Sequence, residues 1–282
     1  MARAWRSFVA AAWLSWQIES NWTQPLLFAL YSIVKPLALT GILVAMYAAV
    51  AHGNFGTPVF TYMYIGNAFY LYVGAVMTGM AFAVIDDRER YQTLKFMSMA
   101  PIDLRAYLVG RGVARIGTSS VSVAIALLLA VFVLHMPLDL HAVQWPLFAA
   151  AFSVGLVMLA ALGLILAATV LLLAHQSWLI GDAVAGSLFL FSGAIFPISV
   201  LPASLRPIAY AMPLTYWLEL LRRAIVPPVA QAFPLLPSVS NAALMALFTL
   251  MTIALGAVAI SVFEVCNWFA RERGYLDRTT GY

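Results

Sequence analysis

Of the 282 residues, 64% are hydrophobic and only 9% are charged, whereas soluble domains are about half apolar and a quarter charged. This composition excludes an ordinary soluble domain and indicates a protein that crosses a membrane several times. The net charge of +4 does not indicate a nucleic-acid partner, because the basic residues gather at the ends of apolar runs. The single cysteine, Cys266, excludes an internal disulfide.

The first 24 residues predict an amphipathic helix that lies at the membrane surface. Large apolar residues recur there at helical spacing, with polar residues off that stripe; they are Trp5, Phe8, Val9, Trp13 and Trp16. Tryptophan favours the headgroup boundary of a bilayer, so residues 1–24 are expected to form an interfacial helix. The alternative is that this stretch is only the frayed start of the first membrane span.

Six apolar stretches follow, each long enough to cross about 30 Å of hydrocarbon at about 1.5 Å per residue. The predicted spans are residues 26–51, 58–85, 106–134, 145–174, 178–196 and 241–265. They predict an all-α membrane protein with one six-span domain over residues 25–282.

Four side chains within the first two spans are candidates for a pathway through the membrane. A lysine inside a span, Lys35, is costly unless it reaches the surface or faces a wet cavity. Phe69, Tyr70 and Tyr72 lie too deep for an interfacial aromatic belt and are suited to stacking on a substrate. The alternatives are that the lysine snorkels to the surface and that the rings only fill space between helices.

Residues 86–105 hold eight of the 26 Asp, Glu, Lys and Arg residues, and a segment this charged must leave the membrane. Apolar residues such as Leu94, Phe96 and Met97 are interleaved with the charges. A solvated loop does not need them, so the pattern predicts a short helix with a docking face.

Prolines divide residues 197–228 into apolar pieces that are too short to cross a membrane. They predict short re-entrant helices in the outer leaflet. Within them, Glu219 has helical spacing for an ion pair with either Arg222 or Arg223.

The basic residues predict the orientation. Eleven lysines and arginines lie in the N-terminus, in the charged segment with the start of the third span, and in the C-terminal tail; three lie on the other face. This bias predicts a plasma-membrane protein with both termini in the cytoplasm.

The motifs of several enzyme classes are missing. No P-loop sequence occurs, so the chain is not expected to hydrolyse ATP by itself. His135 and Asp139 are one residue short of an acyltransferase spacing, and a membrane-embedded acyltransferase using them with Glu219 is the alternative function. His135, Asp139 and His141 together would make at best a weak metal site.

Two stretches resemble the permease subunits of type-2 ABC exporters. The first is FSGAIFPISVLPASLRPIAYAMPLTYWLELLRRAI, residues 191–225; its matching positions are Ser192, Gly193, Phe196, Pro197, Leu201, Pro202, Pro213, Leu214, Tyr216, Glu219 and Arg222. The second is DDRERYQTLKFMSMAPIDLRAYLVGR, residues 86–111, which is similar to the first cytoplasmic loop of that family. A first span with Lys35, Pro36 and Leu37 adds to the likeness, although many members have a neutral residue where Lys35 stands.

The resemblance implies a half-transporter that pairs with a second permease copy or paralogue and with two separate ATP-binding subunits, which bind ATP and Mg. A coupling helix would contact the ATPase through Asp86, Asp87, Arg88, Glu89, Thr93, Leu94, Phe96 and Met97. The substrate pathway would include Lys35, Phe69, Tyr70, Tyr72 and Phe196. The implied activity is outward movement of a lipid, a hydrophobic drug or a lipid-linked glycan, with no catalytic site, cofactor or metal in this chain. An insertase-like scaffold without transport is a further alternative.

Overall fold

The computed structural model describes residues 2–21, 25–51, 54–136, 138–173 and 177–275. Within these ranges all regular structure is helical and no strand occurs, which confirms the predicted all-α class. The long helices are α1 (Ala2–Asn21), α2 (Pro25–Ala51), α3 (Pro58–Ile85), α5 (Leu104–Phe132), α6 (Trp145–Leu172), α7 (Ser177–Phe191) and α11 (Asn241–Glu272). The short ones are η1 (Asp86–Arg90), α4 (Leu94–Met99), η2 (Ile198–Val200), α8 (Arg206–Ala211), α9 (Pro213–Ile225) and α10 (Pro227–Ala232).

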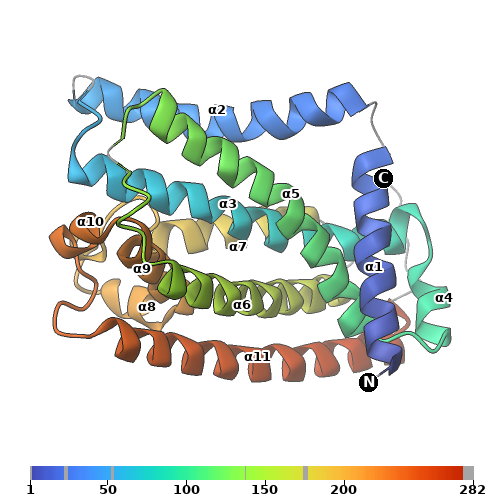
Figure 1. The fold of residues 1–282 in the computed structure, drawn as a ribbon. Coiled ribbons are helices and arrows are strands. Elements are labelled where there is room, and N and C mark those ends of the chain that lie inside the picture. Colours follow the sequence, from blue (N-terminus) through green and yellow to red (C-terminus); the bar gives the residue numbers. More distant parts are fainter. Residues whose placement is uncertain (1, 22–24, 52–53, 137, 174–176, 276–282) are drawn as a thin grey trace.

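Helix α3 lies at the centre of the bundle, packed against α5, α6 and α7, while α6 also packs against α11 (Figure 1). Most of its residues are buried, including Phe60, Tyr64, Met77 and Met80. A helix that is apolar all round is stable only where neighbours or lipid cover every face. The near-continuous apolar sequence of residues 58–85 permits this central place but does not select it, because the more apolar α11 has only 22% of its apolar window buried.

Four helices in the described part of the chain are long and apolar enough to cross a membrane: Pro58–Arg90, Leu104–Phe132, Trp145–Leu172 and Asn241–Glu272. They coincide with the second, third, fourth and sixth predicted spans. The shorter apolar helices Thr40–Ala51 and Ile180–Phe191 fall within the first and fifth. The chain is thus a multi-pass membrane protein, and the six-span topology stays a prediction.

Short polar side chains begin several helices where the sequence turns apolar. Thr57 accepts a hydrogen bond from the amide of Phe60, Asp103 accepts from the amides of Arg105 and Ala106, and Ser240 accepts from that of Ala243. Each of these residues satisfies first-turn N–H groups that have no partner within the helix.

The bundle has two distinct ends (Figure 1). Helix α3 is 28 residues long, or about 42 Å at 1.5 Å per residue. Its last residues lead into η1 and α4, and α1 crosses the bundle there; we name this the α4 end. Helices α8, α9 and α10 gather around the first turns of α3, which we name the α9 end.

Helix α1 packs across α5 with its small residues and exposes its tryptophans. Ala11 and Ser15 are buried, whereas Trp5 and Trp13 are 65% and 64% exposed. The contact is close because α5 has a glycine there: a Cβ atom on Gly110 would lie 2.4 Å from the carbonyl oxygen of Phe8.

We expect Gly110→Ala to weaken the packing of α1 on α5, because the added methyl group has no room. The free energy of unfolding should fall by about 1–3 kcal/mol, measured as a loss of thermal stability of the purified protein. The control is Gly117→Ala on the same helix, where nothing lies within 4 Å of the added atom. Equal stability of the two variants would contradict the packing described here.

Candidate functional site

At the α4 end, the charged segment begins as a direct continuation of α3. The helix widens into the π-helical turn η1, and residues 91–93 then connect it to α4. Asp87 and Arg88 in this turn are only 2% and 3% exposed. Buried charges require partners in the fold, so the contacts of these two residues define the site.

Asp87 is held by helix α5. The hydroxyl of Tyr107 donates a hydrogen bond to its Oδ2 atom at 2.8 Å, and Nη1 of Arg111 lies 3.5 Å from its Oδ1 atom. Arg111 is itself 5% exposed, and its backbone carbonyl accepts a hydrogen bond from Ser15 of α1. One buried ion pair thus joins η1 and α5, and α1 contacts the same turn of α5.

Arg88 is held by the last turn of α6. Its Nη1 atom donates to the carbonyls of Leu173 at 2.9 Å and Val170 at 3.3 Å, and its Nη2 atom lies 3.0 Å from Oε1 of Glu89. Carbonyls at a helix C-terminus lack partners within the helix and carry partial negative charge. The Arg88 guanidinium supplies both hydrogen-bond donors and a positive charge to these carbonyls, and it thereby fixes η1 to α6.

Helix α4 presents a mixed face. Leu94 is buried and packs into the bundle, and the hydroxyl of Thr93 donates to the carbonyl of Asp87. Phe96 and Met99 are 59% and 75% exposed. α4 is therefore anchored from one side and apolar on the other.

The structure divides the predicted coupling residues into two groups. Asp87, Arg88 and Leu94 are buried within this chain, which differs from the expectation that the two charges face a partner. The physical reason is that α5 and α6 supply their counter-groups. The remaining predicted residues are exposed or partly exposed; they are Asp86, Glu89, Thr93, Phe96 and Met97.

At the α9 end, Arg222 is buried and donates its hydrogen bonds to backbone carbonyls. Its Nη2 atom donates to Gly193 at 2.8 Å and to Ala194 at 2.9 Å, and its Nε atom donates to Tyr62 at 3.3 Å. The guanidinium also lies 3.6 Å from the centre of the Tyr62 ring. Burial lowers the pKa of Arg222, and the neighbouring Tyr62 and Glu219 oppose that shift.

Space for this arginine comes from Gly66 on α3. A Cβ atom there would lie 2.1 Å from Nη2 of Arg222 and 1.9 Å from the carbonyl oxygen of Ala194. The loop that supplies the carbonyls turns at Gly193, whose φ of +71° is a conformation that glycine adopts without strain.

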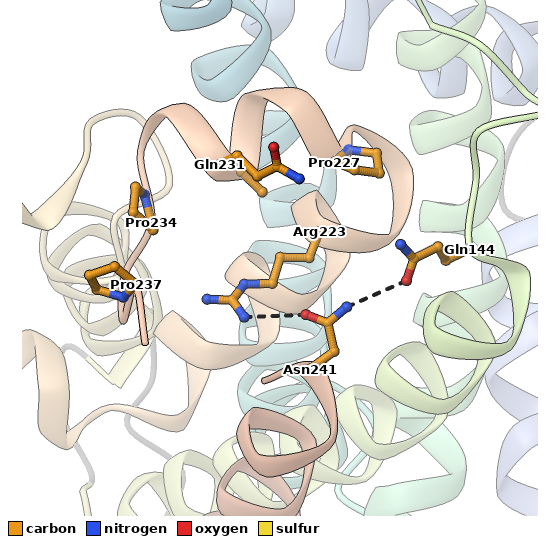
Figure 2. A pocket seen from close by; sticks show the side chains of 8 residues that line it. Gln144, Arg223, Pro227, Gln231, Pro234, Pro237 and Asn241 are labelled. Carbon is orange, nitrogen blue, oxygen red and sulfur yellow. Dashed lines mark hydrogen bonds between the residues drawn. The ribbon is translucent and has the colours of Figure 1, made fainter. Parts of the chain in front are cut away.

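Glu219 pairs with Arg223, not with Arg222. Oε1 of Glu219 lies 3.0 Å from Nε of Arg223. Arg223 also donates to the carbonyls of Leu236 and Val239 and to Oδ1 of Asn241. This arginine lines a pocket of about 260 Å³. Figure 2 shows its hydrogen bond to Asn241, which in turn contacts Gln144.

The predicted pathway residues lie mostly within the packed bundle. The Phe69 ring packs edge-on against Trp217, Tyr70 donates to the carbonyl of Ala185, and Tyr72 donates to Ser120 at 2.9 Å. All three rings are buried in this chain, and Phe196 is partly buried beside Ile198. The side chain of Lys35 lies outside the described residues. A pathway role for these residues stays a prediction.

The residues of the alternative enzyme site make local contacts. His135 contacts the carbonyl of Val133, Asp139 accepts from the amide of His141, and Glu219 pairs with Arg223. In the described ranges no hydrogen bond joins any two of His135, Asp139 and Glu219. Nor do those ranges contain three or more His, Cys, Asp or Glu residues grouped to hold a metal ion.

The family model described as ABC-2 type transporter matches residues 7–226. The chain belongs to the ABC-2 type transporter family. The match includes both ends of the bundle, from α1 and the charged segment through α9, and ends before α11. A comparison with curated proteins finds no match. As a member of this family, the chain is a membrane permease subunit of an ABC transporter, and such subunits work with an ATP-binding subunit.

Sequence reasoning missed the residues that hold the charged segment in this ABC-2 permease. Arg111 and Tyr107 lie in the first turns of α5, and Ser15 lies on α1. The available signal was the arginine itself, because a charge inside an apolar helix requires a partner. Asp87 is such a partner, 24 residues away in the chain.

We expect Arg111→Leu to destabilise the protein strongly, because Asp87 would stay buried without its counter-charge. The free energy of unfolding should fall by about 3 kcal/mol or more. The matched control is Arg105→Leu on the same helix. Arg105 is 41% exposed and pairs at 2.7 Å with the exposed Glu264, so its loss should cost under about 1 kcal/mol. A thermal unfolding series that ranks the two variants equally would contradict the role given to Asp87.

Proposed function

We propose that this chain is the permease subunit of an ATP-driven exporter that moves an amphipathic substrate outward across the plasma membrane. The substrate classes considered are a lipid, a hydrophobic drug and a lipid-linked glycan. Membership of the ABC-2 type transporter family and the apolar helices support a permease. The absence of a P-loop from the sequence supports a separate motor subunit that binds ATP and Mg.

In the proposed topology, both termini and the α4 end are cytoplasmic. The excess of lysine and arginine in the segments of that end supports this orientation. Helix α1 would lie in the headgroup region with Trp5 and Trp13 toward lipid, which fits their exposure. Residues 197–228, with α8 and α9, would form the re-entrant helices of the outer leaflet.

The observation that carries the proposal is the two-sided character of α4. Its exposed side offers Phe96 and Met99, two large apolar residues of the kind found at the centre of a protein interface, and the Lys95 ammonium lies over the Phe96 ring. Its buried side is tied through η1 to α5 and α6. A coupling helix needs both a surface that the ATPase binds and a firm connection to the membrane helices.

ATP-driven closure of two ATP-binding subunits would displace α4 in each of two permease copies or paralogues. Because η1 continues α3 and is paired with α5 and α6, the displacement would move these helices together. The predicted pathway lies among the first, second and fifth spans, which correspond to α2, α3 and α7. Their rearrangement would alternately open it to the two sides.

Purification of the chain together with the products of its neighbouring genes tests the proposal. We expect a stable assembly that hydrolyses ATP, and substrate movement that depends on that hydrolysis. An assembly without ATP hydrolysis, or full activity in vesicles that lack nucleotide and partner, would contradict it. The second outcome is the one that a membrane-embedded enzyme predicts.

We expect Phe96→Asp to weaken binding of the ATP-binding subunit and to uncouple ATP hydrolysis from substrate movement, because a carboxylate replaces an apolar contact residue. Loss of a central contact of this kind costs about 2 kcal/mol or more of binding energy, which is about thirtyfold in affinity. The measurement is the dissociation constant of the two purified subunits.

The matched control is Leu140→Asp. Leu140 is an apolar residue that is 69% exposed and lies in the loop before α6, at the α9 end. Its substitution should leave the dissociation constant unchanged. If the two variants bind equally well, α4 is not the docking helix.

A further inference from the structure

A second cavity of about 260 Å³ lies at the α9 end, and nothing in the coupling mechanism uses it. Its walls come from the start of α3, the loop around residues 192–199, helix α9 and the segment 232–235. Polar and aromatic side chains line it together, among them Tyr62, Ser192, Tyr210, Glu219 and Phe233. The pocket in Figure 2 differs, because its Arg223, Asn241 and Gln144 are hydrogen-bonded to one another.

Ser192, which lines the cavity, has a hydroxyl group that is available for a hydrogen bond to a ligand. The residue is 1% exposed, and its hydroxyl makes no hydrogen bond within the part of the chain that the structure describes. A buried hydroxyl without a partner is unfavourable, so proteins seldom retain one unless a ligand or ordered water completes it. This hydroxyl can both donate and accept.

The carboxylate of Glu219 is the second group of the cavity wall that could bind a ligand. Its Oε1 atom accepts from Nε of Arg223 at 3.0 Å and from the amide of Leu235 at 3.3 Å. Both of these hydrogen bonds end on Oε1, which leaves Oε2 as the carboxylate oxygen that a ligand would meet. Because Glu219 is 2% exposed, bulk water reaches it poorly, and a donor inside the cavity would complete its carboxylate.

The other groups of the wall restrict the charge of a ligand. The Arg222 guanidinium donates to three carbonyls, and the Tyr62 hydroxyl donates to the carbonyl of Gly193. An anion would therefore meet the Glu219 carboxylate with few donors to compensate it. A cation would meet a carboxylate already paired with Arg223 and would lie near buried Arg222. An uncharged donor group fits best.

We propose that this cavity binds one uncharged, hydroxyl-rich group, such as a sugar ring, with its hydroxyls on Ser192 and Oε2 of Glu219. The edge-on pair formed by Tyr62 and Phe233, with ring centres 5.6 Å apart, supplies an apolar wall for the carbon face of the ring. The volume is slightly below that of pockets for drug-sized ligands, which suits one ring and not a whole lipid. On the proposed function, the group is the head of the exported molecule.

Saturation-transfer NMR on the full chain in lipid nanodiscs, without ATP-binding subunit or nucleotide, tests the site separately from the proposed function. The probes are methyl β-glucoside, octyl β-glucoside and an octyl oligoethylene glycol that has the same tail and no ring. We expect binding through the ring protons of one or both glucosides. Binding of methyl β-glucoside indicates a free sugar as ligand, and binding of octyl β-glucoside alone indicates a lipid-borne one.

Ser192→Ala and Glu219→Gln should each weaken glucoside binding about tenfold, since each removes one hydrogen bond to the ligand. The control is Ser187→Ala on α7, an exposed serine whose hydroxyl donates within its own helix. Ser192→Ala removes only a hydroxyl that has no partner here, so it keeps the test valid if Glu219→Gln fails to fold. The proposal is overturned if no glucoside binds, if the oligoethylene glycol binds equally well, or if Ser192→Ala and Ser187→Ala bind alike. Absence of glucoside binding would leave water as the occupant of the cavity.

Discussion

The architecture of the α4 end depends on burying a few charges with partners from distant parts of the chain. Asp87 pairs with Arg111 of α5, and Arg88 donates to the C-terminal carbonyls of α6. Either charge would be too costly to bury alone. Together they fix a turn of only five residues against the bundle, and this turn carries α4. The rigidity of the proposed coupling helix therefore comes from its base and not from its own six residues.

At the α9 end, buried charge is stabilised by a different set of groups. Arg222 neutralises the partial charges of three carbonyls, and Gly66 leaves the space that the guanidinium needs. Arg223 joins α9 to the chain before α11 through the carbonyls of Leu236 and Val239. Short helices broken by proline are thus locked together by two arginines. This arrangement permits irregular backbone at the end of an apolar bundle, because every freed carbonyl named here has a donor.

The sequence predicts the helical class, the bounds of α3 and the charged segment, because those depend on composition and apolar run length. Proline spacing likewise predicts the broken helices near α9. What sequence cannot predict is which charges turn inward. The sequence predicts that Asp87 and Arg88 contact a partner subunit. Their counter-groups within the chain lie 24 and 85 residues away, and sequence alone does not reveal such distant pairs. Glu219 has helical spacing for an ion pair with either Arg222 or Arg223. It pairs with Arg223 because Arg222 donates instead to the carbonyls of residues 62, 193 and 194.

The central claim is that α4 and α5 move as one body when the ATP-binding subunits close. Pulsed electron spin resonance can measure the distance between spin labels on Met99 and Val113, two exposed residues of these helices, introduced as Met99→Cys and Val113→Cys in a Cys266→Ala chain. The measurement is made on the assembly with its ATP-binding subunit, with and without ATP. The account predicts the same narrow distance distribution in both states. A distribution that shifts or broadens when ATP binds would contradict it, because α4 would then move independently of the helix that holds Asp87.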